Sequence, residues 1–417
     1  MAQMINYEEG ISLIGGGMVG ASLALLLAKT LPATPIRLFE CAAASHAAPQ
    51  NEPAWDGRST ALAPTSVSLF RALGVWPQLA PFATAIERIH VSDQGSWGLS
   101  QFTRQDNNQQ PLGQVVENSG LQSVLQHALN QHPNIELIPQ RISTLKPRAE
   151  GMQLSWLSPE GEQTSAAKLV ILADGADSPL RHALGIPVRE VPYEQTALVA
   201  NVRFALPHGG CAFERFCPQG PMALLPRGQS NQGRVGALVW TFPRAEQTAI
   251  AALGDDELIA RLQEAFGHRL GRFEAVGQRQ FYPLRLLVAK EQVRSHLVLQ
   301  GNAAHFLHPV AGQGFNLALR DGLRLAEILS DSPDALGSLA QLKRYEQAVQ
   351  EDQTRTISLS DGFNRVFSRR EPHWRWGRDF GMLLLETLPP LRQAFIQQLS
   401  GKAQPVIFPW GHHAETQ

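Results

Sequence analysis

Residues 11–20 read ISLIGGGMVG, and this stretch decides the fold. A short β-prone run comes first, and Gly15, Gly17 and Gly20 then follow in GxGxxG spacing. An Ala- and Leu-rich segment with helical character comes next, before a second β-prone run, Ile36–Glu40, that ends in an acid. Strand, glycine turn, helix, strand and acid in this order form the βαβ fingerprint of a dinucleotide-binding site.

Each position of the fingerprint has a physical role. Gly15 permits the turn, Gly17 lets the backbone approach a pyrophosphate, and Gly20 lets the helix pack closely on the strand. Met18 and Val19 lie within the turn, which leads into a helix predicted over Ala21–Lys29; the N-terminus of that helix presents free N–H groups and a positive dipole to phosphates. The glycine turn is therefore predicted to bind the phosphates of a dinucleotide.

Glu40 narrows the choice of cofactor. A carboxylate at this spacing can accept hydrogen bonds from a ribose 2′-OH, which favours NAD or FAD over NADP. Only one such fingerprint is visible in the sequence. A site for NAD calls for a separate catalytic constellation, whereas FAD requires the chain to return to the same cofactor elsewhere.

Two later stretches are typical of such returns. The first is the apolar run Leu169–Leu172, followed by Asp174, Gly175 and a polar turn that opens a helix. Taken alone, it is equally well explained as an ordinary junction between a strand and a helix.

The second return begins with the apolar run Leu297–Leu299 and the pair Gly301-Asn302. A Gly-rich loop follows, and then a helix predicted from about Asn316 to Leu329. The N-terminus of that helix would stabilise negative charge on a reduced flavin. The alternative is a loop that uses glycine for turn geometry only.

Composition excludes several other classes of protein. The chain has 417 residues, enough for two to three domains, and hydrophobic residues make up 43%. With 36 Lys and Arg against 37 Asp and Glu, the net charge of −1 argues against a nucleic-acid binder. The three cysteines show no disulfide or zinc spacing, and no signal peptide or membrane-spanning run is evident, so we expect a reduced, cytoplasmic protein.

With three segments in this order, the chain resembles the flavin-dependent aromatic hydroxylases of the p-hydroxybenzoate-hydroxylase type. The resemblance extends from Ile11 to about Gly401. Residues 56–62 (DGRSTAL), and residues 213–226 with the runs FERF and GPMALLP, are similar to the ubiquinone-biosynthesis hydroxylases. The branch that acts on 2-polyprenyl-6-methoxyphenol is the most similar.

This resemblance implies an α/β fold. A Rossmann-like FAD-binding domain would carry an inserted β-sheet substrate domain and a helical C-terminal region. The implied segments are residues 1–183 for FAD binding, with a substrate-domain excursion near 77–113, then 184–285 for the substrate sheet, 286–340 for the FAD-binding return and 341–417 for the C-terminal helices. Alternating patterns at Thr196–Phe204 and Arg234–Phe242 predict strands of the substrate sheet.

The resemblance also implies site residues. The ADP half of FAD would be held by the fingerprint, Gly15, Gly17, Met18, Val19, Gly20 and Glu40. Arg58 would lie beside the cofactor, where a guanidinium suits phosphate, unless it is a helix-capping surface residue. Asp174 and Gly175 would line the junction of FAD and NAD(P)H, and Asn302 would approach the ribityl chain or pyrophosphate. The isoalloxazine ring would be flanked by His308, Pro309, Gly312, Gln313, Gly314, Phe315 and Asn316.

Two positions depart from the family pattern. Most relatives have Asp where this chain has Asn302, and an amide both accepts and donates while removing one negative charge. The Gly-Asn form favours the 2-polyprenyl-6-methoxyphenol branch. Many relatives carry Arg at the position of Asn118, so that residue's phosphate role does not transfer.

The implied chemistry belongs to the cofactor. NAD(P)H would reduce FAD, and a C4a-hydroperoxyflavin formed with O2 would hydroxylate a polyprenylated phenol. Pro221–Pro226 would form an apolar pocket wall, or else simply pack in the core. His305 and His308 are spaced like a metal pair on a helix, but Pro309, nearby glycines and the missing third ligand argue against a metal. No side-chain nucleophile is expected.

The C-terminal part, Leu342–Leu399, has helical character. Arg365–Arg378 holds five arginines with Phe and Trp interleaved, and leucines follow. This pattern suits peripheral contact with the inner membrane or a partner surface. A solvated basic face with core leucines is the favoured explanation of the pattern. Two rival functions remain for the chain: an FAD-binding scaffold, and a flavin oxidoreductase of the same fold that does not hydroxylate.

Overall fold

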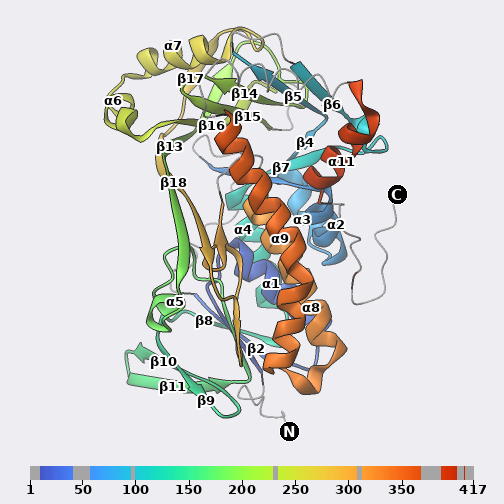
Figure 1. Ribbon diagram of the computed structural model, residues 1–417, viewed down its shortest axis with the longest axis vertical. Helices are drawn as coiled ribbons and strands as arrows, with labels where there is room; N and C mark the ends of the chain where they lie inside the picture. The colour runs from blue at the N-terminus through green and yellow to red at the C-terminus, as the bar shows by residue number, and fades with distance from the viewer. Residues whose placement is uncertain are drawn as a thin grey trace.

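The computed structural model describes residues 10–40, 57–94, 99–228, 233–307, 312–367, 387–401 and 408. Figure 1 shows an elongated molecule with a sheet at each end. The long strands β13 (Val188–Phe204) and β18 (Gln280–Ala289) run between the two ends, and α9 (Leu339–Phe367) lies alongside them.

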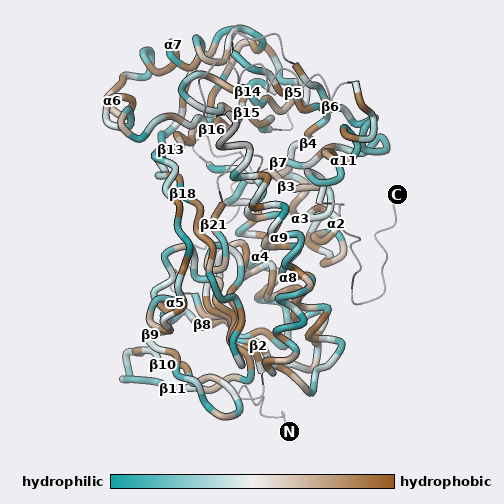
Figure 2. The backbone as a smooth tube through the Cα atoms, in the orientation of Figure 1, coloured by the Kyte–Doolittle hydropathy of each residue, from teal (hydrophilic) through white to brown (hydrophobic). Residues whose placement is uncertain are grey.

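The first sheet has six strands in the order β19-β20-β12-β1-β2-β8. From β20 to β8 neighbouring strands are parallel, and β19 joins β20 antiparallel. The bounds are β1 Ile11–Ile14, β2 Ile36–Phe39, β8 Ile135–Ile138, β12 Leu169–Leu172, β19 Val293–Arg294 and β20 Leu297–Leu299. Figure 2 shows apolar colours gathered on these central strands, as expected for a sheet buried on both faces.

Alternate residues of β1 show how the two faces are covered. Ile11 and Leu13 pack with the helices, whereas Ile14 packs with the small antiparallel sheet β11-β10-β9. The helices are α1 Met18–Thr30, α4 Asn118–Gln131 and α8 Gln313–Asp331, joined by α9; the small sheet comprises β9 Ile142–Arg148, β10 Gly151–Ser158 and β11 Gly161–Ala167, with α5 Pro179–Ala183 nearby. The strands and helices of the fingerprint and its two returns are confirmed.

The second large sheet has the order β21-β18-β13-β16-β15-β14-β5-β6, and β17 pairs with β13. Its further bounds are β5 Arg88–Asp93, β6 Leu99–Thr103, β14 Cys211–Cys217, β15 Gly220–Arg227, β16 Val235–Pro243, β17 Phe273–Val276 and β21 His305–Phe306. The helices α6 (Gln247–Ala251) and α7 (Asp255–Phe266) lie on its outer side, where they enclose one apolar cluster. The two expected strands of the substrate sheet are therefore present, as β13 and β16.

A three-stranded sheet, β3-β7-β4, lies between the two large sheets. Its strands are β3 Ser59–Leu62, β4 Ala83–Ile86 and β7 Gly113–Glu117, with α2 Pro64–Ala72, α3 Trp76–Leu79 and α11 Pro389–Leu399 around it. The α/β fold class is confirmed. The domain boundaries stay a prediction; β5 and β6, from the expected excursion near 77–113, lie in the nine-stranded sheet.

Candidate active site

Adjacent parallel strands bring the three predicted segments to one edge of the six-stranded sheet. The strands β20, β12, β1 and β2 are neighbours and run in the same direction. Their carboxyl ends are therefore neighbours too, and they lead into Asn302, Asp174, the glycine turn and Glu40, respectively. Ligands of open α/β sheets bind outside the carboxyl ends of the strands.

The glycine turn is tightly built at its ends and open in its middle. A Cβ on Gly15, whose φ is +103°, would lie 2.4 Å from the carbonyl oxygen of Ala173. A Cβ on Gly20 would lie 1.8 Å from the carbonyl oxygen of Gly15. A Cβ on Gly17 would meet nothing within 4 Å, so space remains in front of the N-terminus of α1.

Glu40 is held beside this turn. The backbone N–H of Gly16 donates to Oε2 of Glu40 at 2.5 Å. A Cβ on Gly16 would lie 2.8 Å from Cβ of Glu40, so the turn and the acid are in direct contact. The end of β2 therefore places a carboxylate at the turn, as the fingerprint requires.

Asp174 carries an oxygen without a partner. The Ser178 hydroxyl donates to Oδ2 of Asp174 at 2.8 Å, and the same Ser178 oxygen caps α5 by accepting from the N–H of Arg181. Oδ1 of Asp174 is buried and has no hydrogen-bond partner among the described residues. Burial raises the pKa of this carboxyl, and the Ser178 hydrogen bond opposes that shift. Buried polar atoms are normally paired, so this one calls for a ligand.

The buried Arg181 joins the two return segments. Its guanidinium donates to the carbonyl oxygens of Ala303, at 2.9 Å, and Ala176, at 2.7 Å. Burial lowers the pKa of Arg181, and the charge of Asp174 opposes that shift. Ser178 and Arg181 are not among the site residues predicted from the sequence. The partners of Ser178 lie within four residues of it, whereas the bond from Arg181 to Ala303 spans 122 residues, and no local pattern identifies it.

Asn302 is exposed at this edge, whereas Gly301 before it contacts the fingerprint. A Cβ on Gly301, whose φ is +57°, would lie 2.9 Å from Cγ1 of Val19. The exposed Asn302 thus follows a residue that contacts the first turn of α1. Met18, in the same turn, is partly buried and packs against the core.

The glycine loop before α8 is anchored by the amide of Asn316. Its Nδ2 donates to the carbonyl oxygens of Ala61 and Gly312, each at 2.8 Å. Its Oδ1 accepts from the N–H of Ala63 and the hydroxyl of Ser66, each at 2.7 Å. The Asn316 side chain therefore fixes the start of α8 against β3 and α2, and a contact between this residue and a cofactor would come from its backbone.

The other predicted residues of this loop are placed as follows. Gly312, with φ of +61°, precedes α8, and a Cβ on Gly314 would meet nothing within 4 Å. Gln313 is half-buried, and Phe315 packs against the core around α1. His308 and Pro309 lie outside the described residues, so their predicted ring-flanking role stays a prediction.

Two more residues predicted to bind the cofactor are Arg58, just before β3, and Gly175, just after Asp174. Arg58 is exposed, and its guanidinium donates to the Tyr282 hydroxyl of β18 at 3.1 Å. Its predicted phosphate role stays a prediction. A Cβ on Gly175, whose φ is +100°, would meet nothing within 4 Å, so this glycine too borders open space.

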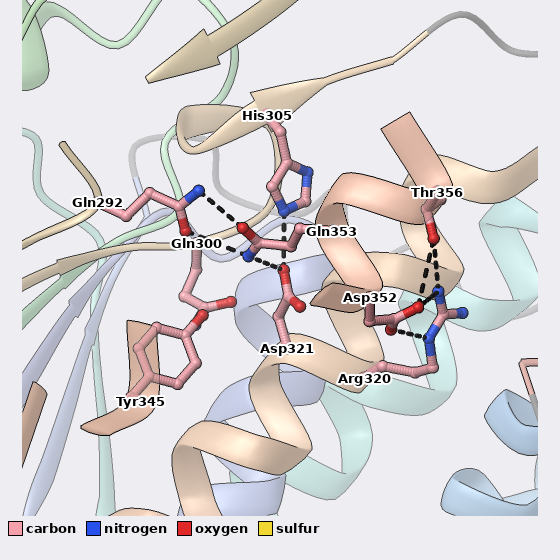
Figure 3. A network of polar contacts seen from close by, with 9 residues as sticks. All are labelled: Gln292, Gln300, His305, Arg320, Asp321, Tyr345, Asp352, Gln353 and Thr356. Carbon is pink, nitrogen blue, oxygen red and sulfur yellow. Dashed lines mark hydrogen bonds and ion pairs between the residues drawn. The ribbon is translucent and has the colours of Figure 1, made fainter. Parts of the chain in front are cut away.

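A buried polar network supports the Asn302 segment from behind, as Figure 3 shows. Nε2 of His305 lies 2.8 Å from Oδ2 of Asp321, and both side chains are fully buried. Gln353 of α9 donates to the same Asp321 oxygen at 2.9 Å and exchanges hydrogen bonds with Gln292. His305 therefore has a structural partner, and the described residues include no group of three potential metal ligands.

The residues present fit FAD. Gly17, Gly175 and Gly314 border open space, and Asp174 points an unpaired oxygen from the same edge of the sheet.

Among the described helices, none is long and apolar enough to cross a membrane.

Comparison with known proteins agrees with this geometry. The FAD binding domain family matches residues 10–358. Ubiquinone hydroxylase UbiL of Rhodospirillum rubrum is 34% identical, over 94% of this chain and 89% of that protein. The 3-demethoxyubiquinol 3-hydroxylase of Escherichia coli is 31% identical, over 95% of this chain and 100% of that protein.

A solved structure shares the fold. The p-nitrophenol 4-monooxygenase PnpA of Pseudomonas putida DLL-E4 superposes with a TM-score of 0.76 at 18% identity, over 96% of this chain and 100% of that one. The open glycine cradle, the unpaired carboxylate oxygen and these similarities lead to one assignment. The chain belongs to the FAD binding domain family, as one of its FAD-dependent monooxygenases.

Proposed function

We propose that this monooxygenase hydroxylates a polyprenylated phenol of ubiquinone biosynthesis, with O2 and NAD(P)H as co-substrates. The observation that carries the proposal is the similarity, over nearly the whole chain, to two hydroxylases, one named for ubiquinone and the other for 3-demethoxyubiquinol. FAD, when bound, takes reducing equivalents from NAD(P)H and activates O2. The protein positions the ring and excludes water.

Different residues would bind different parts of FAD. The N–H groups at the start of α1, around Gly17, would receive the pyrophosphate, and Glu40 would accept from the ribose. The unpaired oxygen of Asp174 would accept a hydrogen bond from the cofactor, with Asn302 beside it. The N-terminus of α8 would favour negative charge on the reduced ring system.

The inner face of the nine-stranded sheet would form the substrate wall. Asn201 of β13 donates to the carbonyl oxygen of Gly57 at 2.8 Å, so this face is turned toward the start of β3. Ala61 at the other end of β3 holds the loop before α8 through Asn316. A wall built largely from aliphatic strand residues suits a ring that bears an isoprenoid chain.

Asn302 supports 2-polyprenyl-6-methoxyphenol as the substrate. Deleting the gene in its host and identifying the accumulated quinone precursor by mass spectrometry tests this choice. A precursor that lacks one ring hydroxyl supports it, and the purified protein should then incorporate one atom of ¹⁸O2 into that precursor. Accumulation of a precursor whose ring is already fully hydroxylated would favour the scaffold or the non-hydroxylating oxidoreductase.

Peripheral contact with the inner membrane is a separate part of the proposal. The arginine-rich segment Arg365–Arg378 lies outside the described residues from position 368 on, but Leu388 and Leu391 at α11 are exposed. Exposed leucines that follow a basic segment in the sequence favour binding to an anionic membrane surface. Co-sedimentation with anionic liposomes at low salt is expected, and its absence would remove this part.

A further inference from the structure

A row of side chains crosses the inner face of the nine-stranded sheet without being fully covered. Strand register aligns Glu214 with one partner on each side, and the row continues to β13. All five members are half-buried: Val91, Glu214, Ala223, Val239 and Val199. Four are aliphatic, and Glu214 is the one charged group among them.

The opposite face shows that this partial exposure is specific to the inner side. On β13, β16 and β15, the residues before and after the row are fully buried in the cluster beneath α7: Leu198, Ala200, Leu238, Trp240, Met222 and Leu224. The outer side of these strands is therefore fully packed, whereas the inner side is buried in part and exposed in part along the row through Glu214. On the inner side, Glu214 and the other members of the row keep part of their surface exposed.

The inner face is turned toward the FAD site. Ala212, two residues before Glu214 on the same face of β14, packs with Ile86 and Val115 of the middle sheet. The Asn201 contact with Gly57 joins the same face to the strand that holds the loop before α8. Glu214 thus lies on the wall that the proposed function assigns to the substrate.

Glu214 makes no hydrogen bond or ion pair with any described residue, which is unusual for a carboxylate in such surroundings. Burial raises its pKa to about 7. Its neighbours across the strands, Val91 and Ala223, offer no polar group. No contact with a described residue therefore accounts for this acid, which leaves it available to a ligand.

Other ionisable groups on this face are engaged elsewhere. Arg227 pairs with Glu117 at 3.2 Å, and Tyr282 accepts from Arg58. Asp93 of β5 stands opposite Phe216 rather than Glu214. None of them is a strand-pair neighbour of Glu214.

We propose that Glu214 is a catalytic residue, the general base that accepts the phenolic proton of the substrate. The O–H bond of the phenol breaks, its electron pair stays on the phenolic oxygen, and an O–H bond forms on the carboxylate. The electron pair left on oxygen makes the ring more reactive toward the electrophilic oxygen that the monooxygenase activity supplies. After hydroxylation, the proton is released to solvent. This inference rests on the proposed function.

The test uses FAD-loaded protein and 2-geranyl-6-methoxyphenol as the probe, comparing wild type, Glu214→Gln and Glu214→Asp from about pH 5 to about pH 9. The control variant is Glu274→Gln, which changes an exposed acid on β17 of the same sheet. Hydroxylated product is measured against NAD(P)H consumed, together with FAD content and Tm.

In wild type, the hydroxylation rate is expected to rise with pH around a midpoint of about 7. Glu214→Gln should lower it by about 10²–10⁴-fold and lose the midpoint, with FAD content unchanged. Glu214→Asp should keep the midpoint at an intermediate rate, and Glu274→Gln should match wild type. A Glu214→Gln protein that keeps both rate and pH midpoint overturns the role of Glu214 alone. A wild type that leaves the probe unreacted overturns the proposed function, and this role with it.

An infrared titration provides a readout that does not depend on turnover. The carbonyl band of a protonated carboxyl should disappear around pH 7 in wild type and in Glu274→Gln, and this component should be missing in Glu214→Gln. If the band is absent above about pH 5 in wild type, Glu214 is an ordinary acid and the proposal is wrong.

Discussion

Nε2 of His305 and Oδ2 of Asp321 lie 2.8 Å apart, joining the strand after Asn302 to the middle of α8 inside the protein. Gln353 completes the contact from α9 at 2.9 Å. Both ends of the second return, the Asn302 turn and the helix after the glycine loop, are thereby held in one geometry. The pair supports the site from behind.

Replacing Asp321 tests that support. Asp321→Ala leaves the buried polar atoms of His305 and Gln353 without their partner, so we expect the free energy of unfolding to fall by about 3 kcal/mol. Urea unfolding with saturating FAD measures it. Asp331→Ala, at an exposed position on the same helix, should cost less than about 0.5 kcal/mol. An equal loss in the free energy of unfolding for the two variants would contradict the stabilising role of Asp321.

Gly17→Val is predicted to abolish flavin retention while leaving the apoprotein folded. The added side chain meets no protein atom within 4 Å of its Cβ, so it enters only the space that the pyrophosphate would occupy. Absorbance of the purified protein measures bound FAD, and circular dichroism measures the fold. A variant that purifies fully yellow would count against the cofactor assignment.

Gly20→Ala is the contrasting variant. Its Cβ would lie 1.8 Å from the carbonyl oxygen of Gly15, so the protein itself must distort. We therefore expect a lower Tm even without FAD, whereas Gly17→Val should keep the Tm of the apoprotein. Two variants with the same Tm would contradict this division between binding and packing.

Arg181→Met should weaken FAD binding without touching the cofactor. It removes two charged hydrogen bonds that hold the Ala176 and Ala303 turns together. Such bonds contribute about 1.5–3 kcal/mol each, of which only a part reaches the site, so we expect about a tenfold rise in Kd. Flavin fluorescence titration measures the Kd. Arg189→Met, at an exposed position of β13, should leave it unchanged, and a shift there would argue for a general effect of lost charge.

The pH dependence of stability reports on Glu214 separately from catalysis. The pKa of about 7 that Glu214 has in the folded protein lies above its ordinary value of 4.5, so the folded state holds the proton more tightly. Its stabilising contribution is complete below about pH 4.5 and is lost as the pH rises toward 7. Relative to wild type, Glu214→Gln should therefore gain about 1–3 kcal/mol between these pH values. Urea unfolding at several pH values checks it, and parallel curves would contradict the raised pKa.

Much of the cofactor site could be predicted from the sequence because its features are local. The spacing of Gly15, Gly17 and Gly20, and the acid after the second strand, lie within one βαβ unit. The apolar strands before Asp174 and Asn302 can likewise be recognised within a few residues. Local propensity and turn chemistry are enough for such segments.

The contacts that complete the site join residues far apart in the chain. Asn316 is bound by Ala61 and Ala63, and Arg181 binds Ala303, yet no pattern in the sequence pairs these positions. In the sequence, Glu214 stands out only as part of the run FERF, which is similar to the ubiquinone-biosynthesis hydroxylases. Its lack of a partner depends on the residues that surround it in the folded protein.

The sequence by itself determined where the strands of the fingerprint and of its two returns lie and where the backbone must turn, and it predicts that a dinucleotide binds at the first turn. Only the tertiary structure decided that β20, β12, β1 and β2 are neighbours, so that four separate segments share one edge. It alone also decided that the row through Glu214 stays partly exposed on the inner face of the larger sheet, while the outer-face residues that flank it on β13, β15 and β16 are buried. The physical reason is that strand order and burial arise from long-range pairing, whereas helix, strand and turn preferences act between near neighbours.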